Sequence, residues 1–353
     1  MPCTYQTGSL SGLRSTSKSR PERAFRARAS AVRTSTFEDR CGPDALSEGH
    51  CYRIFSHRPG NMLDVRSTRL QPMSLAPSER SFLKWVGGKT RYASTLVAIA
   101  PDFSGAYREP FLGSAAVYFE LRPTSSALSD ANGELVACFQ QVKENPLDVM
   151  DLLDTMPNTP EYFDGVRRWS PADLSDLERA ARVIYLNKTS FRGLWRVNRS
   201  GGFNTPYGAY DRPYYNRNTL LRASRALADA TIVESDFEAA IDQAQPGDWV
   251  YLDPPYVPLG GWADFKRYTP GQFGEDDHMR LCAAMCRADS RGVFVTLTNS
   301  DTEFVRELFG AHFCEARLAT RRDINLVSSK RNSWDLVFTN YEPVVPEQLA
   351  MAP

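Results

Sequence analysis

The stretch Val250-Tyr251-Leu252-Asp253-Pro254-Pro255-Tyr256 is an apolar run that stops at an acid, two prolines and an aromatic ring. Neither proline has an N–H to donate and both fix φ, so a strand formed by the apolar residues must end there. We therefore expect Asp253 and Tyr256 at the carboxyl end of a strand, which is where open α/β sheets bind their ligands. The stretch predicts an α/β fold with its chemistry at this edge.

An acid, backbone carbonyls freed by the prolines and a flat ring suit a planar ligand that carries an amino group. The amino group would donate hydrogen bonds to Asp253 and to a proline carbonyl, and the ligand ring would stack on Tyr256. The alternative is a plain strand followed by a Pro-Pro turn with a surface tyrosine. The stretch alone does not decide between the two.

The composition of the 353 residues, 42% hydrophobic and 24% charged, is that of a globular protein. Lys and Arg (42) balance Asp and Glu (42), so a nucleic-acid partner would have to bind a local basic patch. The sequence has no apolar run long enough to span a membrane and no signal-peptide pattern at its N-terminus. We expect a cytoplasmic protein without a membrane segment.

The seven cysteines are odd in number and lack paired CxxC spacing, which indicates reduced thiols. Cys282 and Cys286 lie one helical turn apart in an Ala-rich stretch, and we interpret them as helix-packing residues. Cys41, His50, Cys51 and His57 do not have a usual zinc spacing. No metal site is predicted.

Two glycine turns precede predicted helices. Gly87-Gly88-Lys89 presents backbone N–H groups and a charge to an anion, although a plain turn before a surface helix fits equally well. In 106–119 a short strand leads through small residues around Gly113 into an apolar helix, and Asp130 ends the next strand. An acid there is placed to bind a ribose diol. Because the full GxGxxG is absent, a mononucleoside cofactor such as S-adenosylmethionine fits the pattern.

A further strand ends at Asp236-Phe237, an acid and a ring suited to an adenine.

Basic and aromatic residues alternate between Arg182 and Arg225, where Asp211 is the only acid. Arginines for phosphates and rings for bases are what DNA contact requires. The alternative is a solvated basic face over a tyrosine-rich core.

The N-terminal segment 1–78 is rich in Ser, Arg and Pro and is predicted to be disordered. It would be a basic arm that adds DNA affinity, a targeting peptide, or sequence translated upstream of the true start. We favour the last interpretation, because Met73 stands just before the first patterned segment.

Taken in order, eight segments resemble the Dam-type DNA adenine-N6 methyltransferases, the α group of amino-methyltransferases with a DPPY motif. They are FLKWVGGK (82–89), REPFLGSAAVYF (108–119), LSDANGEL (128–135), YLNKTSFRGLWRVNRSGGFNTPYG (185–208), SDF (235–237), VYLDPPYVPL (250–259), TNSDT (298–302) and SSKRNSWDLVFTNY (328–341). The resemblance implies a Rossmann-like methyltransferase sheet with an inserted, mainly helical DNA-recognition subdomain that carries a β-hairpin. The implied domains are a catalytic domain in two parts (79–135 and 229–342), the recognition subdomain (136–228) and a tail (343–353).

The resemblance also implies the site residues. S-adenosylmethionine would be bound by Trp85, Lys89, Phe111, Gly113, Asp130, Asp236, Phe237 and Asp253. The flipped adenine would be bound by Asp253, Pro254, Pro255 and Tyr256. Double-stranded DNA would be contacted by Lys84, Lys188, Phe191, Arg192, Arg196, Asn198, Arg199, Asn204 and Pro206. The enzyme is expected to be a monomer that needs no metal for the reaction.

Two positions depart from the family pattern. Ala115 stands where the family usually has a further glycine, and Arg192 replaces the asparagine of its Phe-Asn-Gly-Leu segment. The second change leaves the recognition sequence open, although a GATC-like target is compatible with the other matches. Methylation of RNA or of a protein amide is the alternative activity, and a DNA-binding regulator without catalysis is the alternative class.

Overall fold

The computed structural model describes residues 69–70, 81–198, 200–257, 273–321 and 332–344. The interpretations of Cys41, His50, Cys51, His57 and Arg199, and of most of the predicted N-terminal segment, fall outside these residues. Within them, no helix is both long and apolar enough to cross a bilayer.

A single eight-stranded sheet has the order β1-β7-β8-β6-β5-β2-β3-β4. The strands are β1 (Arg69–Leu70), β2 (Tyr107–Glu109), β3 (Ser126–Asp130), β4 (Ala230–Glu234), β5 (Trp249–Leu252), β6 (Phe294–Ser300), β7 (Cys314–Arg321) and β8 (Asn332–Thr339). All neighbours pair in parallel except β8, which runs antiparallel to both β6 and β7. The predicted Rossmann-like α/β sheet is confirmed.

The centre of the sheet is β5, whose four residues are all buried. The chain builds outward from β2 through β3 to β4, then returns to place β5 on the other side of β2. The strand order therefore reverses between β2 and β5, and open α/β sheets bind their ligands at such a switch point. The predicted acid-and-proline motif follows β5 directly.

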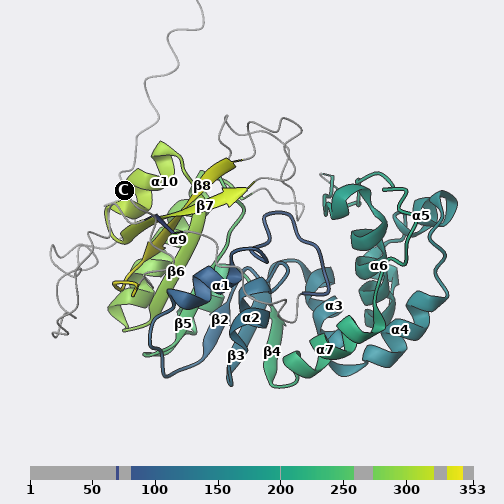
Figure 1. The fold of residues 1–353 in the computed structure, drawn as a ribbon, viewed down its shortest axis with the longest axis horizontal. Helices are drawn as coiled ribbons and strands as arrows, with labels where there is room; N and C mark the ends of the chain where they lie inside the picture. Colours follow the sequence, from purple (N-terminus) through teal and green to yellow (C-terminus); the bar gives the residue numbers. More distant parts are fainter. Residues whose placement is uncertain (1–68, 71–80, 199, 258–272, 322–331, 345–353) are drawn as a thin grey trace, which may run out of the picture. The chain divides into compact units, whose positions relative to one another are not determined.

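Helices between β3 and β4 form a separate layer (Figure 1). They are α3 (Gly133–Glu144), α4 (Pro146–Asp154), α5 (Pro160–Val166), α6 (Asp176–Thr189) and α7 (Arg217–Leu227), with short 3₁₀ turns at Pro171–Asp173 and Phe191–Gly193. The sequence specifies their starts: Pro146 and Pro160 stand at first-turn positions, and Ser175 and Glu178 form a capping box. The remaining helices are α1 (Ala93–Ala98), α2 (Ala116–Leu121), α8 (Phe237–Asp242), α9 (Glu275–Ser290) and α10 (Glu303–Gly310).

The predicted hairpin follows α6. Its two arms meet through antiparallel bridges between Ser190 and Tyr207 and between Val197 and Phe203. The Asn198 side chain closes the tip by accepting hydrogen bonds from the backbone N–H groups of Ser200 (3.0 Å) and Gly202 (2.9 Å).

Strand β1 lies inside the segment 1–78 that was predicted to be disordered. Arg69 and Leu70 pair in parallel with Arg317 and Leu318 of β7. For these two residues the prediction is wrong, because they extend the sheet. A chain starting at Met73 would lack β1.

Candidate active site

Asp253 follows β5 at the switch point, and its partner is Lys89. The Lys89 ammonium donates to Asp253 Oδ1 over 2.6 Å and to the Gly87 carbonyl over 2.8 Å. The side chain of Lys89 is only 4% exposed and that of Asp253 is 18% exposed. The sequence predicts that Lys89 binds an anionic group of the cofactor. In the structure, its ammonium forms an ion pair with Asp253, the acid of the DPPY motif.

A second donor, Thr298 at the carboxyl end of β6, reaches the same oxygen. Its hydroxyl donates to Asp253 Oδ1 over 2.9 Å. Burial raises the pKa of Asp253, while Lys89 and then Thr298 act in the opposite direction. The two donors therefore stabilise the ionised carboxylate in a buried position.

Tyr256 is held at both ends. Its hydroxyl donates to Asp335 Oδ2 over 3.0 Å, and the Lys89 ammonium lies 4.6 Å from the centre of its ring. Asp335, on β8, also accepts a hydrogen bond from Thr320 of β7 over 3.1 Å. The two antiparallel-paired strands thus orient the aromatic ring of the motif. Of the two prolines between Asp253 and Tyr256, Pro254 is buried and Pro255 half-buried.

Glu109 ends β2 on the other side of the switch point. It is 3% exposed and accepts a hydrogen bond from Tyr107 over 2.8 Å. Burial raises the pKa of Glu109 to about 8, and the charge of Asp253 acts in the same direction. Glu109 is therefore largely protonated at neutral pH in this structure.

Gly113 lies in the turn that follows β2, with φ +46. A Cβ at this position would lie 3.0 Å from the Trp85 indole, so the backbone conformation and the packing both favour glycine. The Gly113 N–H donates to Asp130 Oδ2 over 3.2 Å, and the Asn132 N–H donates to Oδ1 over 2.9 Å. Trp85, Gly113 and Asp130 are thus brought together as predicted. Burial raises the pKa of Asp130 to about 6.

Phe111 and Phe237 stack with their ring centres 5.4 Å apart. Phe273 lies against both, at 5.7 and 5.6 Å. The sequence placed the first two rings at the cofactor and did not identify Phe273. The guanidinium of Arg280 covers Phe237 at 4.8 Å.

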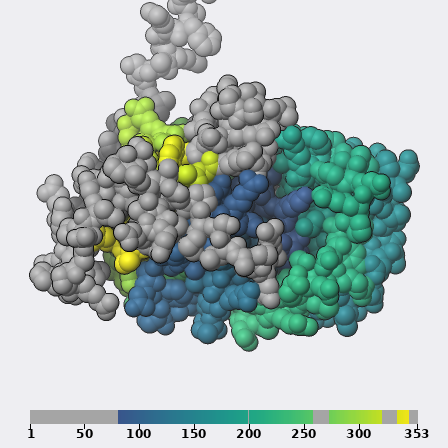
Figure 2. Space-filling view, viewed as in Figure 1, coloured from purple at the N-terminus to yellow at the C-terminus, as the bar shows by residue number. Residues whose placement is uncertain are grey.

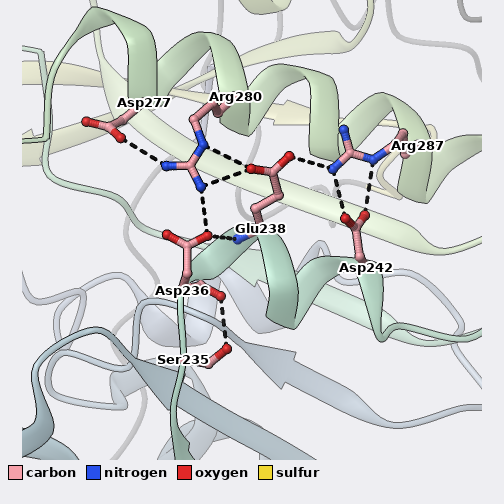
Figure 3. A network of polar contacts seen from close by, with 7 residues as sticks. All are labelled: Ser235, Asp236, Glu238, Asp242, Asp277, Arg280 and Arg287. Carbon is pink, nitrogen blue, oxygen red and sulfur yellow. Dashed lines mark hydrogen bonds and ion pairs between the residues drawn. The ribbon is translucent and has the colours of Figure 1, made fainter.

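Arg280 also fixes Asp236, the residue before Phe237. Figure 3 shows its guanidinium between three acids, which are Asp236 just before α8, Glu238 on α8 and Asp277 on α9. The distances are 2.9, 2.9 and 3.2 Å. Asp236 Oδ1 additionally accepts the Glu238 N–H as the N-cap of α8. The network joins the turn after β4 to the first turns of α9.

The first segment of the chain contacts the helical layer next to the predicted DNA residues. Asn187 of α6 exchanges hydrogen bonds with the Lys84 backbone. In Figure 2, blue atoms from the first described part of the chain lie next to the teal atoms of the helical layer. Lys84, Lys188 and Arg212 lie close enough to influence one another: burial, then Lys84 and Arg212, lowers the pKa of Lys188 to about 8. In the part of the chain that the structure describes, none of these three pairs with a carboxylate.

Some of the other predicted DNA residues are exposed, and the rest form hydrogen bonds within the hairpin. Phe191 (45% exposed), Arg192 and Pro206 are exposed. Arg196 instead donates to Asn204 Oδ1 over 2.6 Å and to its carbonyl over 3.1 Å, so two predicted contacts bind each other within the hairpin. Asn198 uses its side-chain oxygen in the hairpin tip.

Several residues of the basic and aromatic run do not face solvent. Tyr185, Trp195 and Phe203 are buried in the core of the helical layer. Arg182 is 1% exposed and forms an ion pair with Glu134. The interpretation of the whole run as a DNA-facing surface is therefore wrong for these four, because their side chains complete a core instead. The alternative of a tyrosine-rich core describes Tyr185 correctly, whereas the buried, ion-paired Arg182 does not belong to a solvated basic face.

Sequence reasoning missed four residues that contact the motif or its surroundings: Glu109, Thr298, Phe273 and Asp335. Glu109 and Thr298 carry a detectable signal, since each is a polar residue near the carboxyl end of a strand and lies inside a segment that carries the family resemblance. Asp335 carries none, because it lies in the interior of a strand whose direction only the sheet reveals.

A Rossmann-like sheet with an acid-Pro-Pro-Tyr motif at its switch point agrees with the methyltransferase class that the sequence resembles. Residues 85–324 match the family model of the D12 class N6 adenine-specific DNA methyltransferases. The Type II methyltransferase M1.LlaDCHI of Lactococcus lactis subsp. cremoris is 37% identical over 272 residues, which cover 74% of this chain and 95% of that protein.

Two further relatives agree. The Type II methyltransferase M.MjaIII of Methanocaldococcus jannaschii is 32% identical over 287 residues (74% of this chain, 99% of that protein). The DNA adenine methylase of Haemophilus influenzae is 31% identical over 274 residues (74% and 94%). The chain belongs to the D12 class, and it is a site-specific, adenine-specific DNA methyltransferase.

Proposed function

We propose that this methyltransferase takes its methyl group from S-adenosylmethionine and acts on N6 of an adenine flipped out of duplex DNA. The observation that carries the proposal is the convergence of Lys89 and Thr298 on Asp253, beside the ring of Tyr256. A charged acceptor and an oriented ring at the switch point are what a flipped adenine requires.

The residues around the turn after β2 fit the cofactor. Asp130 is fixed by two backbone N–H groups and can accept hydrogen bonds from a ribose diol. Phe111, Phe237 and Phe273 offer aromatic surface to an adenine, and Asp236 offers it a hydrogen-bond acceptor. Gly113 and Trp85 shape the turn between these groups. When bound, the cofactor supplies an electrophilic methyl group on a sulfonium.

Asp253 would accept a hydrogen bond from the amino group of the target adenine. Lys89 and Thr298 both donate to Oδ1, so Oδ2 is the oxygen assigned to the N6–H of the target adenine. That hydrogen bond, with a second one to the Pro254 carbonyl, draws the N6 lone pair out of conjugation with the ring and directs it at the methyl group. Lys89 keeps the acceptor ionised.

Tyr256 and its prolines position the base. The Lys89 ammonium lies on one face of the Tyr256 ring, so the adenine stacks on the other face. Pro254 and Pro255 end β5 and give the motif its rigidity.

The DNA duplex would contact the surface formed by Lys84, Lys188, Arg192 and the hairpin. Burial and the nearby charge of Arg212 lower the pKa of Lys84, and burial, Lys84 and Arg212 lower the pKa of Lys188, so this surface has a local excess of positive charge that suits a run of phosphates. The helical layer (136–228) would act as the recognition subdomain. We further propose that the enzyme is a cytoplasmic monomer and that its target is GATC-like. Sequencing of methylated host DNA would identify the target sequence.

The decisive experiment is Asp253→Asn, assayed for N6-methyladenine formation and for DNA binding. We expect methyl transfer to fall by about three orders of magnitude while DNA affinity stays within about twofold, since the change removes a charge at the reacting group only. Asp301→Asn is the matched control, because Asp301 pairs with Arg306 after β6. Undiminished methylation by Asp253→Asn would refute the assignment. An inactive DNA-binding regulator would be indicated if the wild-type chain bound DNA without methylating any duplex.

A further inference from the structure

A cluster of three metal-binding side chains lies on α9 and just after α10. The Sγ atoms of Cys282 and Cys286 and a ring nitrogen of His312 all lie within 4.8 Å of one another. The spacing of the two cysteines predicts helix-packing residues, and no metal was expected from the sequence. The third donor could not be seen there, because His312 follows a different helix.

We propose that Cys282, Cys286 and His312 form a binding site for a thiophilic divalent cation, with Zn²⁺ as the expected ion. Two thiolates and an imidazole are the preferred donors of zinc, and three protein ligands with a solvent molecule make a complete tetrahedral shell. The proposal does not depend on the methyl-transfer mechanism.

The backbone presents the donors in a suitable arrangement. Cys282 and Cys286 are four residues apart on α9 (Glu275–Ser290), so their side chains lie on the same face of one helix. With zinc–sulfur bonds of about 2.3 Å, tetrahedral geometry requires the two sulfurs about 3.8 Å apart, which is within the observed limit.

His312 is fixed relative to α9 through α10. Its backbone N–H donates to the Phe309 carbonyl over 3.1 Å, and the Cys282 thiol donates to the Leu308 carbonyl of the same helix over 3.4 Å. A bound ion would replace this thiol contact and join the two helices directly.

Access to the site is compatible with metal exchange. Cys282 is buried, whereas Cys286 and His312 are half-buried. Two of the three donors are therefore partly open to solvent, from which an ion can reach the site after folding.

The test uses the full-length protein, reduced, stripped with a chelator and then loaded with Zn²⁺ or Co²⁺. After removal of unbound metal, we expect the wild type to retain about one equivalent more zinc than Cys286→Ser or His312→Ala. The Co²⁺ form should show a thiolate-to-metal charge-transfer band that both variants lose. Cys314→Ser is the matched control, because Cys314 is also half-buried and stands two positions after His312 in the chain but is not part of the cluster.

A second measurement needs no variant. Zn²⁺ should protect Cys286 of the wild type from alkylation, read by peptide mass spectrometry, while Cys314 reacts equally with and without metal. Equal zinc content in the wild type and in both variants would overturn the proposal and leave only binding elsewhere, for example at the cysteines of the N-terminal segment. Unchanged alkylation of Cys286, or a Cys282–Cys286 disulfide in place of bound metal, would overturn it as well.

Discussion

The Tyr256 hydroxyl donates a hydrogen bond to Asp335 Oδ2 over 3.0 Å, which ties the last residue of the DPPY motif to a strand about eighty positions further along the chain. Asp335 is 6% exposed, and its second oxygen accepts from Thr320. A buried acid with both oxygens engaged is a rigid support, so the orientation of the Tyr256 ring depends on β8 as much as on the prolines.

The first prediction concerns this support. Asp335→Asn should lower kcat by about tenfold, equal to about 1.4 kcal/mol of barrier, because asparagine offers one acceptor oxygen to the two donors Tyr256 and Thr320 and holds the ring less firmly. DNA affinity should change little, and the fluorescence of 2-aminopurine at the target position should report impaired stacking. Glu315→Gln, on neighbouring β7 and paired with Arg306, is the control. If Asp335→Asn and Tyr256→Phe have strictly additive effects, the two residues do not act together.

The second prediction concerns Lys89. Lys89→Met removes the largest influence that opposes the raised pKa of Asp253, so that pKa rises further. The acid limb of the pH–rate profile should then move to higher pH, and the rate at neutral pH should fall by about tenfold to a hundredfold. Lys143→Met should leave the profile in place, because the Lys143 ammonium donates to the Ala230 carbonyl on β4. An unmoved acid limb in Lys89→Met would contradict the role of the ion pair.

The third prediction follows from Glu109. Its folded-state pKa of about 8 exceeds the unfolded value of 4.5, so its contribution to stability is present below pH 4.5 and is lost as the pH rises through about 8. Between these values each pH unit should lower the free energy of unfolding by about 1.4 kcal/mol. Glu109→Gln should remove this slope in denaturant titrations, since the amide oxygen still accepts from Tyr107. Glu120→Gln, on α2 beside Ser94, should retain the slope.

The fourth prediction separates two arginines of one network. Arg280→Ala should raise the KM for S-adenosylmethionine about two- to fivefold, because it removes the cation over Phe237 and releases Asp236. Arg287→Ala serves as the control, because Arg287 forms ion pairs with Glu238 and Asp242 and not with Asp236. Equal effects of the two changes would mean that Arg280 acts only by holding α8 to α9.

The fifth prediction concerns Arg192, whose φ of +57 is unfavourable for an arginine. Arg192→Asn restores the residue of the related segment and should raise the free energy of unfolding by about 1 kcal/mol, because asparagine tolerates the left-handed region. The same change should reduce the salt dependence of DNA binding by about one ion. Arg212→Asn, exposed and with an ordinary φ, should weaken DNA binding without the gain in stability. A loss of stability in Arg192→Asn would show that the turn needs the arginine side chain.

The sequence by itself determined the α/β sheet, the position of Asp253 and Tyr256 at a strand end, and the turn that unites Gly113 with Asp130. These features follow from local causes: prolines that end a strand, small residues in a turn and apolar runs of strand length. The resemblance of ordered segments added the class of reaction, because their joint spacing is specific even though each is short.

Tertiary structure alone decided which side chains meet. Lys89 pairs with Asp253 across 164 positions, Asp335 reaches Tyr256 because β8 enters the sheet in reverse, and His312 joins two cysteines from another helix. The burial of Arg182 was likewise not predicted, because neither interpretation of the basic and aromatic run places an arginine in the core. Such contacts depend on strand order and helix packing, which bring distant residues together and leave no periodic signal in the chain.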